Sequence, residues 1–88
     1  MSRGNARTAP RPAGTILAVT PSGMFTLRAP GPDVVSEGTH VTEPRSGVRG
    51  VVARVFGPVS QPYLSMRPRR VPSPAEGLRL IGATVWVE

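Results

Sequence analysis

The chain has 88 residues, enough for one small domain, and it lacks cysteine, which excludes disulfides and thiolate metal sites as reinforcement. No apolar run approaches the roughly 20 residues that span a membrane, and the basic amino terminus has no apolar run behind it. We therefore expect a soluble intracellular protein without a secretory signal. The chain has eleven arginines, no lysine and five acidic residues, so its formal net charge is +6. Such a charge favours polyanionic surroundings, namely nucleic acid or a ribonucleoprotein.

The amino-terminal segment combines three arginines with Pro10 and Pro12 and has almost no large apolar side chain. Such a composition cannot bury enough apolar surface to fold. We therefore predict a disordered basic tail over residues 1–12 and one folded domain over 13–88. At the start of that domain, the apolar and partly β-branched run at 14–19 predicts a first strand.

A β-hairpin is predicted around this first strand. Residues 20–23, with proline early and glycine late, are typical of a turn. The run at 24–28 then alternates, so that Phe25 and Leu27 share one face of a second strand.

Three more strands are predicted in the middle of the chain, at 40–42, 48–57 and 63–67. Gly50, inside the longest of them, indicates a bulge or a sharp bend of the kind that lets a small sheet close. Simple alternation divides that strand into one face with Val51, Ala53 and Val55 and another with Val52, Arg54 and Phe56.

The remaining segment, 68–82, is predicted to be a loop with one short helical turn near 75–80. A last strand is predicted at 83–88, with Trp86 pointing outward between two inward valines. Six short strands without a long helix predict an all-β fold. The expected architecture is a small closed six-stranded antiparallel barrel of the translation-protein or reductase-isomerase kind, because closure removes exposed strand edges.

Residues that could carry chemistry are sparse. No two of the five acids share a strand face at the spacing of a carboxylate pair, and His40 is the only histidine. No serine lies in a nucleophile motif, and no glycine-rich phosphate loop is present. We therefore expect a protein that is not an enzyme and that binds no cofactor or metal.

The stretch VFGPVSQPY at 55–63 has turn residues but no charge. Pro58 and Pro62 fix their own φ angles and restrict the residues before them, so the loop is expected to be stiff. Two interpretations remain open on composition. The loop is either a preorganised recognition surface, which binds at low entropic cost, or a hairpin end whose apolar groups cap the core of the barrel.

The sequence VFGPVSQPYLSMRP at 55–68 resembles the signature of the small β-barrel core subunit of H/ACA ribonucleoproteins, the glycine/arginine-rich-domain (Gar-one) family. The residues that match are Phe56, Gly57, Pro58, Val59, Pro62, Tyr63, Ser65, Arg67 and Pro68. The opening hairpin and the closing GATVWV stretch are similar to that family in outline, so the likeness covers about 14–88. The repeated arginine-glycine arms of eukaryotic members are missing, and this resembles the compact archaeal form.

The resemblance implies a non-catalytic accessory subunit of the H/ACA guide-RNA pseudouridylation particle. Such a subunit docks on the catalytic domain of a TruB-type (dyskerin-like) pseudouridine synthase and assists substrate RNA loading, turnover and release during rRNA processing and ribosome biogenesis. Contact with the guide RNA would be mostly indirect, and the free protein is expected to be monomeric. It would be cytoplasmic in an archaeal cell and nucleolar in eukaryotic relatives.

Two sets of residues follow as candidates for these contacts. Those expected at the protein interface are Phe56, Pro58, Val59, Pro62, Tyr63 and Leu64. Those expected to lie nearest to RNA are Arg67, Arg69 and Arg70.

The main alternative is a free-standing small-barrel RNA-binding module. Such a module needs aromatic side chains for base stacking interleaved with basic residues, and the basic cluster that begins at Arg67 lies close to Tyr63 in the sequence. A barrel domain of translation-factor type is compatible with the predicted fold but lacks a nucleotide-site motif, and a fold alone does not determine function.

Overall fold

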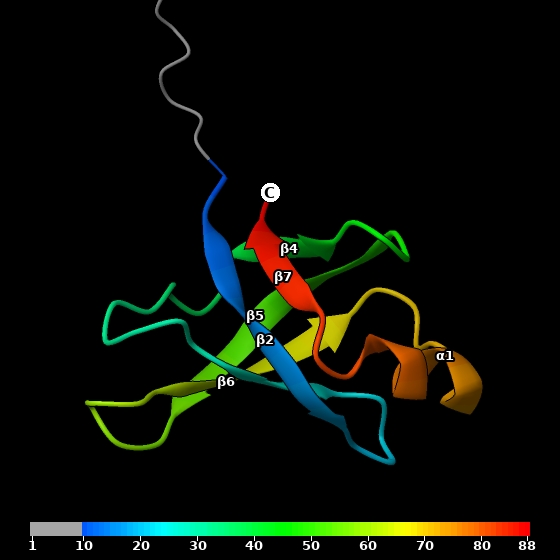
Figure 1. Cartoon of the computed structure of the whole chain (residues 1–88), viewed down its shortest axis with the longest axis horizontal. Helices are drawn as coiled ribbons and strands as arrows, with labels where there is room; N and C mark the ends of the chain where they lie inside the picture. Colours follow the sequence, from blue (N-terminus) through cyan, green and yellow to red (C-terminus); the bar gives the residue numbers. More distant parts are fainter. Residues whose placement is uncertain (1–9) are drawn as a thin grey trace, which may run out of the picture.

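The computed structural model describes residues 10–88 (Figure 1), so residues 1–9, most of the predicted tail, lie outside the described part. Within it the chain forms six strands and one short helix. In chain order these elements are β2 (Pro12–Val19), β3 (Phe25–Arg28), β4 (His40–Glu43), β5 (Val48–Phe56), β6 (Tyr63–Pro68), α1 (Pro74–Leu80) and β7 (Thr84–Val87).

The strands close into a barrel in the order β2-β3-β6-β5-β4-β7. All six neighbouring pairs are antiparallel, and the pairing of the first strand, β2, with the last, β7, completes the ring (Figure 1). The predicted all-β closed six-stranded barrel is therefore confirmed.

The barrel begins slightly earlier than the sequence indicated. Pro12 belongs to β2 and lies opposite Trp86 of β7. The backbone N–H of Val87 donates a hydrogen bond to the carbonyl of Arg11 at 2.9 Å. Of the segment predicted as a tail, Pro12 is thus part of the sheet, and Arg11 is hydrogen-bonded to β7.

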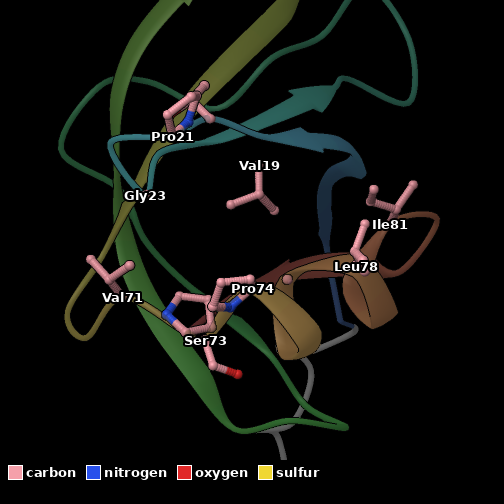
Figure 2. A pocket seen from close by; sticks show the side chains of 11 residues that line it. Val19, Pro21, Gly23, Val71, Ser73, Pro74, Leu78 and Ile81 are labelled. Atoms are coloured by element: carbon pink, nitrogen blue, oxygen red, sulfur yellow. The ribbon is translucent and has the colours of Figure 1, made fainter.

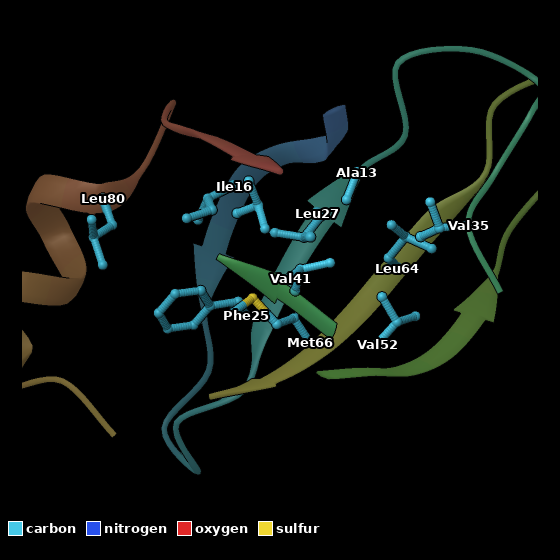
Figure 3. Close-up of a cluster of buried hydrophobic side chains, with 11 residues drawn as sticks. Ala13, Ile16, Phe25, Leu27, Val35, Val41, Val52, Leu64, Met66 and Leu80 are labelled. Carbon is cyan, nitrogen blue, oxygen red and sulfur yellow. The ribbon is translucent and has the colours of Figure 1, made fainter. Parts of the chain in front are cut away.

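Alternation along the strands fills the interior of the barrel (Figure 3). Phe25 and Leu27 of β3 and Leu64 and Met66 of β6 point inward and are fully buried, as the two-residue period of these strands predicts. The complete set of buried core residues is Ala13, Ile16, Phe25, Leu27, Val35, Val41, Val52, Leu64, Met66, Leu80 and Val85.

The long strand β5 departs from simple alternation. Its register against β6 shifts between Val52 and Arg54, where a bulge inserts one extra residue. Val52 is buried before the bulge, and after it Val55 packs against the core. The prediction that Val55 shares a face with Val51 and that Val52 shares one with Phe56 was therefore wrong.

Gly50 has a different role from the bulge that it was predicted to mark. A Cβ atom at this position would collide with the carbonyl oxygen of Arg67 and with the Met66 side chain. The missing side chain therefore lets β5 and β6 cross closely, and the bulge itself lies a few residues further along.

The predicted helical turn is present as α1, which begins with a capping box. The Ser73 hydroxyl accepts a hydrogen bond from the Glu76 amide at 3.3 Å, and the Glu76 carboxylate accepts one from the Ser73 amide at 3.1 Å. Pro74 at the first helical position needs no N–H partner. Leu80, in the last turn, inserts into the core and anchors the helix to the barrel.

Candidate interaction surfaces

The side chains that could bind a metal or act in catalysis do not cluster in the described part of the chain. No group of three or more histidine, cysteine, aspartate or glutamate side chains is placed to hold a metal ion among residues 10–88. None of the helices described there is long and apolar enough to cross a membrane. His40 is exposed at the start of β4. The surfaces of the barrel are consequently the candidate functional sites.

The one buried acid, Glu43, has a structural role at the turn between β4 and β5. It is 1% exposed, and its carboxylate accepts hydrogen bonds from the Ser46 hydroxyl and amide, both at 2.7 Å, and from the Arg45 amide at 3.1 Å. Burial raises the pKa of Glu43, but these hydrogen bonds and the charge of Arg45 outweigh it, so the pKa lies below its usual value. The lowered pKa favours the ionised carboxylate, and its oxygens already accept hydrogen bonds from Ser46 and Arg45. Glu43 is therefore not available as a general acid.

The loop between β5 and β6 is held by its own hydrogen bonds. The backbone N–H of Gln61 donates a hydrogen bond to the Pro58 carbonyl at 3.1 Å. The side-chain amide of Gln61 donates one, also at 3.1 Å, to the carbonyl of Ala29, the residue that follows β3. Gly57 has a φ of 90°, a conformation that disfavours other residues, and a Cβ there would also collide with the Tyr63 ring. The expected stiffness therefore has a structural cause beyond the two prolines.

Two aromatic rings close the base of this loop. Phe56, the last residue of β5, lies opposite Tyr63, the first of β6, and their rings stack with centroids 5.9 Å apart. The guanidinium of Arg54 lies 5.2 Å from the centre of the Phe56 ring, within cation–π range. The stack fixes both the loop and the position of Arg54.

The six residues predicted for the protein interface do not all reach the surface. Leu64 is fully buried in the core and Pro62 is also buried, so these two side chains are not exposed to a partner. Tyr63 is half-buried in the stack. The exposed members are Phe56, Pro58 and Val59, and Val59 is 88% exposed. We call Phe56, Pro58, Val59 and Tyr63 the loop surface.

The three arginines predicted to lie near RNA are exposed at the end of β6 and just after it. Arg67 is exposed on the outer face of β6. Arg69 and Arg70 follow the end of that strand, and the Arg69 amide donates to the Arg49 carbonyl of β5. Arg67 also shares its face of the sheet with Arg28 of β3 and Arg54 of β5. No local sequence pattern reveals this grouping, since it depends on the pairing of three strands.

A second apolar surface, not predicted from the sequence, lies between α1 and the turn that joins β2 to β3 (Figure 2). It is a groove of about 480 Å³, which we call the helix groove. Its lining includes Val71, which is 61% exposed, and Leu78, which is 72% exposed. The only sequence signal was the presence of separate large apolar residues in a segment interpreted as a loop. The apolar residues that line it are Val19, Pro21, Val71, Pro72, Pro74, Leu78 and Ile81.

Comparison with known proteins identifies a similar fold. No family model matches the chain, and no curated protein matches it. Among solved structures, the chain is similar to the Gar1 domain of NAf1, with a TM-score of 0.65 and 18% sequence identity over 100% of this chain and 99% of that one. At that identity the likeness shows a shared fold over the full length of both chains.

Proposed function

We propose that this barrel is a non-catalytic accessory subunit of an H/ACA-type guide-RNA particle, which docks on a TruB-type pseudouridine synthase and assists substrate RNA loading, turnover and release. One observation carries the proposal. The FGPV motif, which resembles the signature of the H/ACA barrel family, lies on an exposed and internally braced loop. The likeness to a Gar1 domain over the whole chain supports the same assignment.

The loop surface has the physical properties that docking requires. Its hydrogen bonds, its two prolines and its stacked rings leave little conformational freedom to lose on binding. Val59, at its tip, is almost fully exposed although it is apolar. Isolated apolar side chains are common on surfaces, but here one lies beside exposed Phe56 and Pro58 on a rigid support.

The decisive experiment measures binding of the purified protein to the TruB-type synthase of the same cell by calorimetry. Val59→Asp is expected to weaken binding at least about thirtyfold, which corresponds to the ~2 kcal/mol of an interface hot spot. Leu78→Asp in the helix groove is the matched control, because Leu78 is also an exposed apolar residue whose change to aspartate leaves the core intact. It is expected to change binding less than about twofold.

Two outcomes of this experiment would change the proposal. A wild-type protein that does not bind the synthase contradicts the proposed function. Binding that is lost with Leu78→Asp but not with Val59→Asp keeps the function and moves the interface to the helix groove. If docking holds, the barrel should raise the multiple-turnover rate of the guided reaction and leave the single-turnover rate unchanged, because it assists RNA exchange and not the chemical step.

A further inference from the structure

The outer face of three neighbouring strands gathers arginines from distant parts of the sequence. Arg28 of β3 lies opposite Tyr63 of β6, and Arg54 of β5 lies opposite Ser65. Arg67 lies two residues beyond Ser65 on the same side of β6, since outward and inward side chains alternate. All three arginines are exposed. We call Arg28, Arg54, Arg67 and the hydroxyl residues Thr26 and Ser65 between them the arginine face.

These positive charges are uncompensated within residues 10–88. The one ion pair there joins Arg49 and Glu88, at 3.6 Å, and involves none of the three arginines. No carboxylate points outward from β3, β5 or β6. The acids lie elsewhere: Asp33 and Glu37 between β3 and β4, Glu43 at the β4–β5 turn, Glu76 in α1 and Glu88 after β7. A positive potential therefore covers this side of the barrel.

The geometry allows the arginines to reach one ligand together. Adjacent strands are about 4.8 Å apart and each residue advances about 3.4 Å along a strand. Arg28 and Arg54 are two strands and two residues apart, so they start about 12 Å from each other, and Arg67 starts about 7 Å along β6 from Ser65. Long arginine side chains can converge over such distances. Arg54 is already positioned, because its guanidinium rests against the Phe56 ring.

The centre of the face indicates which kind of ligand fits. Thr26 and Ser65 lie opposite each other there, and both are half-buried on the outer side of the sheet. A protein interface normally has an apolar centre depleted in charge, whereas this centre carries hydroxyl groups surrounded by arginines. Arginine guanidiniums and serine or threonine hydroxyls are typical donors to phosphate oxygens.

From this arrangement we propose that the arginine face binds the sugar-phosphate backbone of single-stranded RNA. Arg28, Arg54 and Arg67 would each contact a phosphate, with Thr26 and Ser65 donating hydrogen bonds between them. A flexible single strand can follow the curved sheet and place a base against the Arg54 guanidinium or the Tyr63 ring, as in other positively charged grooves with aromatic side chains. The arginine face adjoins the loop surface at Phe56 and Tyr63, and it adds a direct RNA contact to the proposed function.

Net charge alone would give a protein of this composition some affinity for RNA, so the test compares variants of equal charge. The probe is a fluorescently labelled single-stranded RNA of mixed sequence, about 12 nucleotides long to span one small barrel, with its duplex as a second probe. Arg28→Gln/Arg54→Gln/Arg67→Gln is compared with the control Arg69→Gln/Arg70→Gln/Arg79→Gln. Binding is measured by fluorescence anisotropy at several salt concentrations.

The arginine-face triple variant is expected to lose most of the single-strand affinity. Its slope of log K against log salt should become shallower by about 2, since each of three lost phosphate contacts contributes about 0.7 for single strands. The control triple variant should change the slope by less than about 0.7, the value of one contact. Ser65→Glu, which adds a single carboxylate to the centre of the face, should also weaken binding, whereas Ser60→Glu in the β5–β6 loop should do so less.

Several results would overturn this proposal. Equal losses in the two triple variants would mean non-specific attraction by net charge, and tighter binding of the duplex would exclude a single-strand surface. If the arginine-face variants bind RNA normally but bind the synthase weakly, the face is a protein interface. Thermal unfolding by circular dichroism identifies any variant that does not fold. If a triple variant does not fold, the comparison of Ser65→Glu with Ser60→Glu replaces it, and equal RNA binding by these two variants would contradict the proposal. Synthase docking is measured without RNA, so the two proposals fail independently.

Discussion

Glu43 couples the stability of the barrel to pH. Its carboxylate is buried at a turn, and its pKa lies below the ordinary value because hydrogen bonds from Ser46 and Arg45, with the charge of Arg45, outweigh the effect of burial. The unfolded chain binds this proton more tightly than the folded one. Glu43 therefore stabilises the fold fully above its unfolded pKa, about 4.3, and the contribution disappears as the pH falls through the lower folded pKa.

Removing the Ser46 hydroxyl tests this link. Ser46→Ala should lower the free energy of unfolding at pH 7 by about 2 kcal/mol, because it deletes a hydrogen bond to a buried charged group. The loss should shrink at pH 3, because lowering the pH favours the protonated carboxyl and so removes the charge that the hydroxyl stabilises. Urea unfolding at the two pH values measures both quantities, with Ser60→Ala on the exposed β5–β6 loop as the control. An equal loss at pH 3 and pH 7 would show that the hydroxyl does not act through the charge of Glu43.

At the scale of elements, α1 depends on its amino-terminal cap. A helix of seven residues has little intrinsic stability, so its capping box and the insertion of Leu80 into the core together hold it in place. Ser73→Ala removes the hydroxyl that accepts from the Glu76 amide. We expect the free energy of unfolding to fall by about 1 kcal/mol.

Equilibrium unfolding in urea measures the effect of Ser73→Ala. Ala75→Ser is a useful comparison, because it adds a hydroxyl two residues after the cap residue, within the first turn, and leaves Ser73 and Glu76 unchanged. A Ser73→Ala variant as stable as the wild type would mean that packing of the helix, and not its cap, holds α1. Because α1 forms one side of the helix groove, loosening it should also perturb the NMR signals of Val71 and Leu78.

The elements themselves were largely predictable from the sequence, whereas the surfaces were not. Phe25 and Leu27 show the two-residue period of a strand with one buried face, and the structure buries both. Beyond Val52, the same rule fails in β5, since a bulge has no residue pattern of its own and Gly50 marked a close crossing instead. The prediction placed Leu64 at the interface as part of the apolar stretch around the loop, although its place in the alternation of β6 directs it inward.

Non-local pairing accounts for the remaining difference between sequence and structure. Arg28 and Arg54 are far apart in the chain and meet only because β6 pairs with β3 on one side and with β5 on the other. The helix groove likewise combines Val19 with Leu78, and no short window contains both. A sequence pattern reports local periods, so it identifies strands but does not say which strands become neighbours.

For the molecule as a whole, closure predicts uniform protection of the sheet. Every strand has a partner on each side, and the seam between β2 and β7 is strengthened by hydrogen bonds such as that from the Ile16 amide to the Ala83 carbonyl at 2.9 Å. The paired amides of β2 and β7 should therefore exchange with solvent as slowly as those of β5 and β6, through global unfolding. Hydrogen exchange followed by NMR tests this. Fast exchange confined to β7 would indicate a barrel that opens at this seam.

The bulge in β5 also shifts the alternation of inward and outward side chains by one residue. Before it, the inward side chains are those at even-numbered positions such as Val52, and after it they are at odd-numbered ones such as Val55. If the same residues alternated without a bulge, Arg54 and Phe56 would face the interior. The bulge therefore sets which residues in the second half of β5 line the barrel and which form its exterior. Substitutions can remodel what this side of the barrel recognises, and deletion of the extra residue, Ala53, would leave a regular strand whose outward residues are unchanged.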